Sequence, residues 1–137
     1  MALVAISPEP LSVQACLDAV ADSSAGGVGL FVGVVRDGDD GRGVTALSYS
    51  AHPSAVHILA DVCAEAAARE GITAVSALHR VGDLVVGDLA VVVAVSGPHR
   101  GEALEATRWL IDTLKERVPI WKEQTFRDGG KEWVGSP

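Results

Sequence analysis

The sequence predicts one α+β domain over residues 1–137, built around a mixed or antiparallel sheet. Segments with strand and helix patterns follow in the order β-α-β-β-α-β-β-α-β-β, so several strands succeed one another without an intervening helix, which is typical of α+β folds. Hydrophobic residues make up 48% of the chain and aromatic residues only 4%, which predicts a core of Val, Leu, Ile and Ala. A chain of this length can bury such a core in one domain.

The first third of the chain predicts three strands and one helix. A short apolar strand is expected over residues 2–6, and a helix with apolar residues on one face is expected over residues 11–21. Residues 28–35 are almost all apolar, which predicts a strand buried on both faces. An acidic, glycine-rich loop at residues 37–43 leads into another strand over residues 44–51.

The middle of the chain predicts a helix followed by two strands. Pro53 suits the first turn of the helix, and Gly71 is placed to end it. The expected apolar stripe of this helix consists of Val56, Leu59, Ala60, Cys63 and Ala67. Residues 73–81 and the β-branched residues 89–95 predict strands, the second of them central, and residues 82–88 predict a bend or crossover.

The last third predicts a long helix and a closing hairpin. The helix covers residues 99–117, and Pro119 stops it. Its expected apolar stripe consists of Ala103, Thr107, Leu110, Ile111, Leu114 and Val118. Trp109 points away from this stripe, which indicates either a second packing layer or a subunit interface. Residues 120–126 and 131–134 predict the two strands of the hairpin.

The charge distribution separates the last third from the rest of the chain. The formal net charge is −7, which makes nucleic acid and anionic membranes poor partners. Residues 1–98 hold 11 acidic and 4 basic residues, whereas residues 99–137 hold 7 of each. Without a signal peptide or an apolar run of about 20 residues, the chain is expected to be cytoplasmic. Cys16 and Cys63 lie in apolar helical patterns and are expected to be small buried hydrophobes.

Basic side chains of the last third suggest a site for an anion. His99 and Arg100 open a helix, where positive charges interact unfavourably with the helix dipole. The usual reason for cations at this position is an anionic ligand bound at the start of the helix. Lys115 lies on the flank of the apolar stripe, and Lys122 follows on a strand. Partial desolvation of such a lysine would make it usable as a base or nucleophile. The alternatives are an ordinary exposed helix start, a snorkelling lysine and a solvated strand lysine.

Arg36 is the remaining candidate, because it ends the strand at residues 28–35 and could hold a phosphate or carboxylate in a bidentate fork. The alternative is a surface ion pair with Asp37, Asp39 or Asp40. His79 and Arg80 end another strand, but nothing in the sequence favours including them in the site. His52 and His57 have no partner at metal-ligand spacing, and we expect neither a metal nor a cofactor.

Four motifs together make the chain similar to the large, catalytic subunit of molybdopterin synthase, the MoaE family. The motifs are residues 27–36 (GVGLFVGVVR), residues 79–84 (HRVGDL), His99-Arg100, and Leu114-Lys115 with Pro119-Ile-Trp-Lys122. The resemblance runs from about residue 4 to Val134. It implies an α/β hammerhead fold with additional β structure.

The resemblance also implies an activity and its partners. The family is a sulfurtransferase of molybdenum cofactor biosynthesis that converts cyclic pyranopterin monophosphate into molybdopterin. Two sulfurs arrive on the C-terminal Gly-Gly thiocarboxylate of a small ubiquitin-like carrier subunit. The large subunit forms a homodimer within a heterotetramer. This chain ends in Gly135-Ser-Pro137 and not in Gly-Gly, so it resembles the acceptor of sulfur.

The resemblance assigns roles to particular residues and leaves one alternative function. Lys115 and Lys122 resemble the catalytic lysines, without a settled division of roles between them. The implied substrate-binding residues are Val34, Val35, Arg36, His99, Arg100, Lys115, Lys122, Glu123 and Gln124. The resemblance further suggests a pocket shared between two protomers. Glu123 stands where many relatives have lysine, which keeps open the alternative of a non-catalytic paralogue that binds an anion or a partner.

Overall fold

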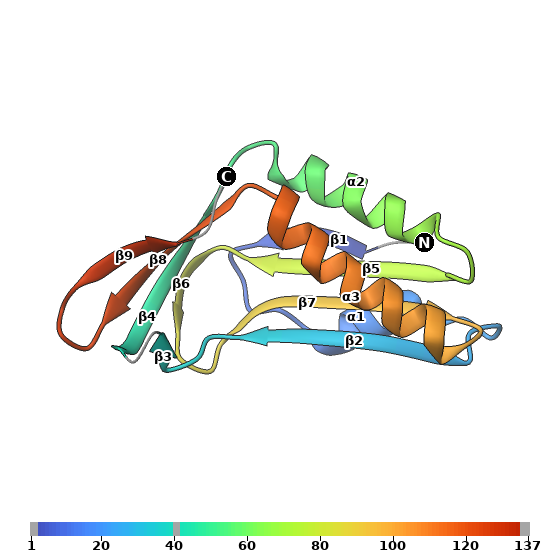
Figure 1. Cartoon of the computed structure of the whole chain (residues 1–137), viewed down its shortest axis with the longest axis horizontal. Coiled ribbons are helices and arrows are strands. Elements are labelled where there is room, and N and C mark those ends of the chain that lie inside the picture. The colour runs from blue at the N-terminus through green and yellow to red at the C-terminus, as the bar shows by residue number, and fades with distance from the viewer. Residues whose placement is uncertain (1–2, 40–41, 135–137) are drawn as a thin grey trace.

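The computed structural model describes residues 3–39 and 42–134, and its elements confirm the predicted α+β class (Figure 1). Residue 2 of the first predicted strand, residues 40 and 41 of the acidic loop, and residues 135–137 lie outside the described residues. The elements in chain order are β1 (Leu3–Ser7), α1 (Val13–Val20), β2 (Gly27–Val34), β3 (Gly38–Asp39), β4 (Arg42–Ala51), α2 (Ala55–Ala67), β5 (Ala74–Arg80), β6 (Gly82–Val85), β7 (Leu89–Gly97), α3 (Arg100–Arg117), β8 (Ile120–Phe126) and β9 (Lys131–Val134).

The strands form two sheets that meet end to end. The first has the order β1-β5-β7-β2, in which β1 and β5 are parallel and the other pairs antiparallel. The second has the order β3-β4-β8-β9, with β6 paired to β4, and extends beyond one end of the first sheet (Figure 1). The mixed sheet and the additional antiparallel structure are therefore both confirmed.

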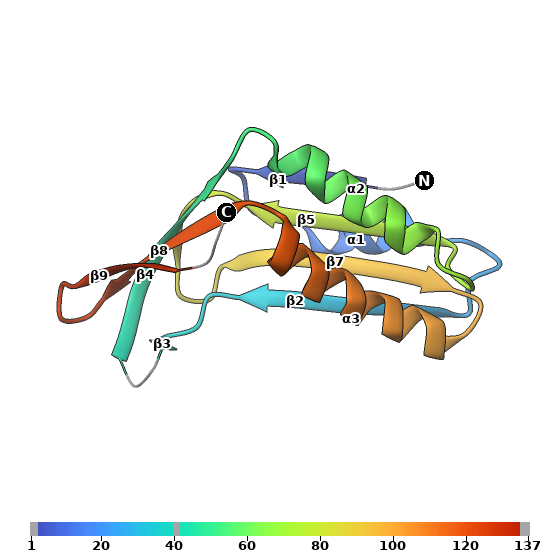
Figure 2. The same cartoon turned by 45° about the horizontal axis from the view of Figure 1, so that its top comes forward.

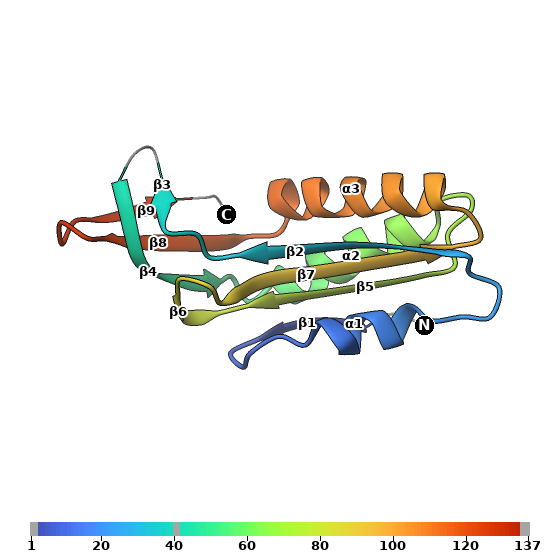
Figure 3. The same cartoon turned by 90° about the horizontal axis from the view of Figure 1, so that it is seen from below.

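Helices cover both faces of the first sheet. The α1 helix lies on one face and α3 on the other (Figure 3), and α2 runs beside α3 (Figure 2). The alternation of side chains along β5 and β7 creates this arrangement. Val75 and Ala77 pack towards α2 and α3, whereas Ala74 and Leu78 pack towards α1. The β7 strand is buried along nearly its whole length, as predicted for a central strand.

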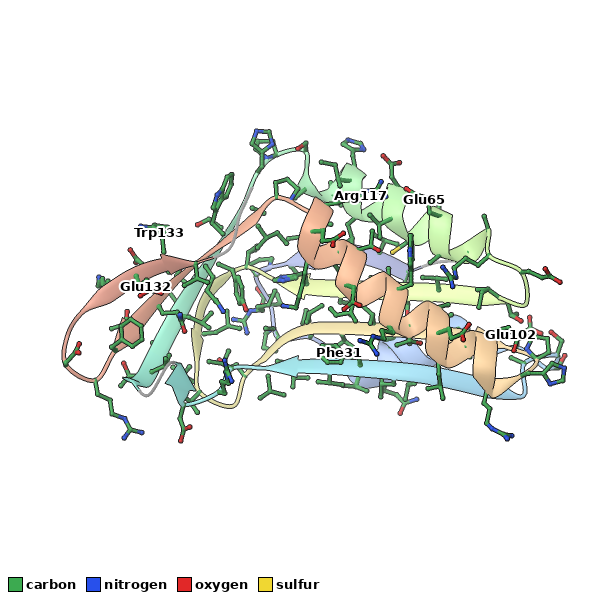
Figure 4. All side chains as sticks on the ribbon, viewed as in Figure 1. Phe31, Glu65, Glu102, Arg117, Glu132 and Trp133 are labelled. Atoms are coloured by element: carbon green, nitrogen blue, oxygen red, sulfur yellow. The ribbon has the colours of Figure 1, made fainter. Side chains whose placement is uncertain are left out.

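The prediction that residues 28–35 are buried on both faces is wrong. The β2 strand lies at the edge of the first sheet and pairs only with β7 there. Four large apolar side chains of β2 are consequently exposed: Val28, Leu30, Phe31 and Val34. Phe31 is labelled in Figure 4. The uniformly apolar run of residues 28–35 therefore forms an edge strand of the sheet, which a single chain leaves partly exposed.

Three smaller expectations also need correction. Residues 82–85 are not a bend but form β6, which pairs with β4; Gly82 at the start of β6 and Gly87 in the turn after it adopt positive φ. Part of the expected loop at residues 37–43 forms β3, which pairs with the start of β4. The buried face of α2 is rotated from the expected stripe, because Val56 is exposed whereas Val62 is buried.

Contacts along α3 hold this helix over the sheet. All six residues of its expected stripe are buried, so that prediction is confirmed. Near the end of the helix, Arg117 makes a bidentate ion pair with Glu65 of α2, at 2.7 and 3.0 Å (Figure 4). Trp109 is half-buried against the core and lies under the Arg69 guanidinium, which corresponds to the expected second packing layer. Among the helices in the described segments, none combines the length and apolar character needed to cross a membrane.

Candidate active site

A cavity of about 540 Å³ lies where the first sheet meets the second. Its wall includes the end of β2, the last turns of α3, and parts of β4, β5 and β8. The charged or polar side chains that line it are Arg36, Tyr49, His79, Lys115, Lys122 and Gln124. The rest of the lining is apolar and includes Val34 and Val35. Six of the nine residues implied by the family resemblance therefore meet in one place.

The end of α3 brings the two lysines together. Lys115 lies in the last turn of α3, where the helix dipole favours a cation. Val118 ends the helix, and the chain passes through Pro119 directly into β8. In β8, Lys122 pairs with Tyr49 of β4, which fixes its place in the wall of the cavity. The short connection between Lys115 and Lys122 thus gives both side chains access to the same space.

Alternation along β8 separates two further predicted residues. Lys122 and Gln124 face the cavity, and Gln124 is buried. Glu123 points to the opposite side of the strand and lines a second, smaller hollow with Lys131 and Asp83. The carboxylate of Glu123 is therefore not part of the cavity wall.

Arg36 reaches the cavity from the end of β2. The backbone there is tied to the turn before β7, because Val35 N–H donates to Asp88 O (2.9 Å) and Gly87 N–H donates to Val35 O (2.8 Å). These bonds hold Val34, Val35 and Arg36 beside the last turn of α3. Arg36 is exposed at the edge of the cavity, and a guanidinium group has the geometry to hold a phosphate or carboxylate in a bidentate fork.

His79, like Tyr49, is a polar residue of the cavity wall that sequence reasoning left out of the site. It is 6% exposed and ends β5, on the face that carries Val75 and Ala77. Its Nδ1 lies 2.7 Å from Arg80 O, and its ring makes an edge contact with Tyr49 at 5.0 Å between centroids. Burial lowers the pKa of His79 from 6.5 to about 4, with a smaller contribution from the charge of Lys115. Side chains alternate between the two faces of β5, so His79 shares a face with Val75 and Ala77. This alternation is the sequence signal that could have placed His79 in the site.

His99 and Arg100 are not part of this cavity. They lie at the start of α3, whereas Lys115 lies near its end. A helical rise of 1.5 Å per residue separates Arg100 from Lys115 by roughly 22 Å along the helix. Both residues are exposed, and the His99 side chain makes no capping hydrogen bond. No side chain of this length can span such a distance within one chain.

The cavity is cationic although the protein is acidic. Arg36, Lys115 and Lys122 line it, and no carboxylate does so among the described residues. Cations in a partly apolar wall suit a ligand that carries phosphate or carboxylate groups. Within residues 3–39 and 42–134, no three His, Cys, Asp or Glu side chains are close enough to form a metal site. The arrangement can bind an anion and supply ammonium groups next to it.

Comparison with known proteins identifies the family. A model of the MoaE protein family matches residues 6–117. Molybdopterin synthase catalytic subunit 1 of Mycobacterium tuberculosis is 43% identical over 131 residues, covering 95% of this chain and 88% of that protein. The molybdopterin synthase catalytic subunit of Pyrococcus abyssi is 38% identical over 128 residues, covering 93% and 86%.

A solved structure agrees with these matches. Molybdopterin synthase from Staphylococcus aureus superposes with a TM-score of 0.88 at 36% identity, covering 95% of each chain. The superposition thus leaves only a small part of either chain outside it. The chain therefore belongs to the MoaE protein family.

Proposed function

We propose that this chain catalyses the molybdopterin synthase reaction, the conversion of cyclic pyranopterin monophosphate into molybdopterin by transfer of two sulfurs. The observation that carries the proposal is the cavity in which Arg36, Lys115 and Lys122 meet without a carboxylate among the described lining residues. A phosphate-bearing substrate matches this charge, and the apolar part of the wall matches a pterin ring.

The residues take separate roles in this proposal. Arg36 holds the phosphate by a charge-assisted, bidentate hydrogen bond. Lys115 assists attack by the sulfur nucleophile, either by proton transfer or through a transient covalent link to the substrate. Lys122 stabilises negative charge that develops during the reaction or positions the incoming sulfur carrier. Val34, Val35 and Gln124 complete the wall around the substrate.

Sulfur comes from a partner in this proposal. The partner is a small ubiquitin-like subunit that ends in a Gly-Gly thiocarboxylate. An extended tail of two glycines is thin enough to enter a cavity of this size, and its negative charge is attracted by the same cations. The chain acts as one domain in the cytoplasm, where the buried, unpaired Cys16 and Cys63 remain thiols.

Two copies of the chain complete each site. Exposed Val28, Leu30, Phe31 and Val34 on the edge strand β2 provide an apolar surface for a homodimer. An antiparallel arrangement of two α3 helices would bring His99 and Arg100 of one protomer to the lysines of the other. This accounts for two cationic residues that lie too far from the cavity of their own chain. Glu123 lies outside the cavity and is proposed to contact the substrate or carrier only from its rim.

The decisive experiment compares two lysine variants. Lys115→Ala should abolish formation of molybdopterin from the cyclic substrate and the thiocarboxylated carrier while retaining the thermal stability of the wild type. Lys131→Ala, at the exposed lysine of β9, is the matched control and should keep normal turnover. A folded Lys115→Ala variant with near-normal turnover would refute the proposed catalytic role of this site. Tight binding of the substrate by the wild type without any product would support the non-catalytic alternative.

A further inference from the structure

The environment of His79 fixes both its orientation and its tautomer. The Nδ1 atom lies 2.7 Å from Arg80 O, and a carbonyl oxygen can only accept a hydrogen bond. Nδ1 therefore carries the proton in the neutral ring, which leaves Nε2 with a free lone pair. The edge contact with Tyr49 favours this orientation of the ring; the two centroids are 5.0 Å apart at an interplanar angle of 87°.

His79 is also kept neutral by what surrounds it. Its neighbours on the adjacent strands are Ile6 and Val91, which are apolar. The charged groups that share its cavity are Arg36, Lys115 and Lys122, which are all cationic, and burial opposes a charge on the ring as well. The imidazole is thus a neutral hydrogen-bond acceptor, whereas the charged groups that line the same cavity are hydrogen-bond donors.

The position of His79 directs this acceptor towards α3. His79 follows Val75 and Ala77 on the face of β5 that packs against α2 and α3, and it lines the same cavity as Leu114 and Lys115 of α3. Both Lys115 and His79 line this cavity, and the charge of Lys115 contributes to the lowered pKa of His79. Because Nδ1 is turned to the backbone, the ring nitrogen left for the cavity is Nε2.

We propose that His79 is a positioning residue for Lys115, whose ammonium group donates a hydrogen bond to Nε2 of the neutral, Nδ1-protonated ring. An exposed lysine side chain samples many rotamers, and a fixed acceptor restricts it to those that direct Nζ into the cavity. The catalytic consequence rests on the proposed function of Lys115, whereas the hydrogen bond itself does not. Orientation of a reacting group at this level commonly changes a rate by factors of ten to a hundred.

Nitrogen NMR of the histidine rings tests the hydrogen bond without any turnover. In the wild type at neutral pH, His79 should show the Nδ1-protonated tautomer. Lys115→Ala should move the Nε2 resonance towards that of a free acceptor, and Lys122→Ala, which leaves the donor in place, should not. An Nε2-protonated ring, or an Nε2 resonance that ignores the loss of Lys115, would overturn the proposal.

A pair of substitutions tests the consequence for catalysis. His79→Asn keeps a donor for Arg80 O but has no acceptor at the position of Nε2, whereas His79→Gln can place its carbonyl oxygen there. His79→Asn should lower kcat roughly 10- to 100-fold with little change in KM, and His79→Gln should recover most of the loss. A purely structural role predicts the opposite order, because Asn preserves the bond to Arg80.

The two proposals fail in different ways. If wild-type protein makes no product but the Nε2 resonance responds to Lys115, the proposed reaction is wrong and the hydrogen bond stands. If the wild type is active but His79→Asn turns over as fast as His79→Gln, His79 does not position Lys115. Comparison of the thermal midpoints of both variants ensures that a loss of kcat is measured on folded protein.

Discussion

Gly29 on β2 and Thr107 on α3 lie so close together that no side chain fits between them. A Cβ added to Gly29 would collide with Thr107 Oγ1 and lie 2.8 Å from Ala103 O. Thr107 cannot turn away freely, because its hydroxyl donates to Ala103 O at 2.7 Å. This contact sets the distance between α3 and the edge strand, and so the place of Lys115 beside the end of β2.

Gly29→Ala should therefore destabilise the protein by about 2–3 kcal/mol, as overpacking of a close contact does. Gly101→Ala is the matched control, because a Cβ there meets nothing within 4 Å and replaces a helical glycine. It should be neutral or stabilise the protein by up to about 1 kcal/mol. Denaturant unfolding measures both, and equal free energies of unfolding for the two variants would contradict the close contact.

The ion pair between Arg117 and Glu65 should contribute a small, salt-dependent stabilisation. Arg117 holds Glu65 in a bidentate geometry, which lowers the pKa of that carboxyl, but both side chains are partly exposed and solvent screens the pair. Glu65→Gln should lower the thermal midpoint slightly at low salt and have no effect at high salt. Asp112→Asn breaks the more exposed, longer pair with Arg108 and should change nothing. A loss from Glu65→Gln that persists in high salt would indicate packing instead.

Burial of His79 should make the folded state sensitive to acid. Its pKa is about 4 when folded against an ordinary value of 6.5, so between these values the unfolded chain binds a proton that the folded chain does not. Stability should therefore fall as pH drops from 6.5 towards 4, by at most roughly 3 kcal/mol from this group. No carboxylate in the described cavity lining offsets this effect, since Arg36, Lys115 and Lys122 are cationic and Tyr49 and Gln124 are uncharged.

Two variants isolate this contribution. His79→Gln should flatten the dependence of the free energy of unfolding on pH between 4 and 6.5, whatever its stability at neutral pH. His52→Gln, at an exposed histidine, should keep the wild-type slope. Identical slopes for the wild type and His79→Gln would show that His79 is not kept neutral by the fold.

Local patterns carried most of the fold but not its edges. The periodicity of α3 and the β-branched run of β7 predicted burial correctly, because each reflects the side of one element that faces a core. The apolar run of β2 led to a wrong prediction of burial. An apolar sequence does not distinguish a strand in the middle of a sheet from an apolar edge strand that a single chain leaves exposed. Pairing of β6 with β4 depends on a long-range contact that residues 82–88 do not encode locally.

The candidate site divides in the same way. Arg36 was found because it ends a recognisable strand, Lys115 because it flanks the apolar stripe of α3, and Lys122 because it follows Pro119 on the next strand. The structure brings all three to one cavity. His79 was missed, because only the packing of β5 against α3 distinguishes it from any histidine at a strand end. His99 and Arg100 were grouped with the lysines by charge, and the length of α3 separates them.

Mixed dimers can decide whether His99 and Arg100 serve the partner's cavity. Lys115→Ala and Arg100→Ala should each be inactive alone. In a dimer of one copy of each, carrying different affinity tags and isolated by both, a site shared between protomers gives one cavity with both defects and one intact cavity. Such dimers should recover about half of the wild-type activity. If each chain used its own Arg100, both cavities would be defective and no activity would return.

A second mixed dimer provides the control. Lys115→Ala combined with Lys122→Ala should stay inactive, because both lysines line the cavity of their own chain and each site then lacks one of them. Recovery in this pair would mean that the lysines come from different protomers, contrary to the geometry at the end of α3. Failure to isolate any doubly tagged dimer would refute the shared site, since the exposed apolar edge of β2 would then not join two copies. Leu30→Asp should abolish mixed dimers and their activity together, because it puts a charge on that edge.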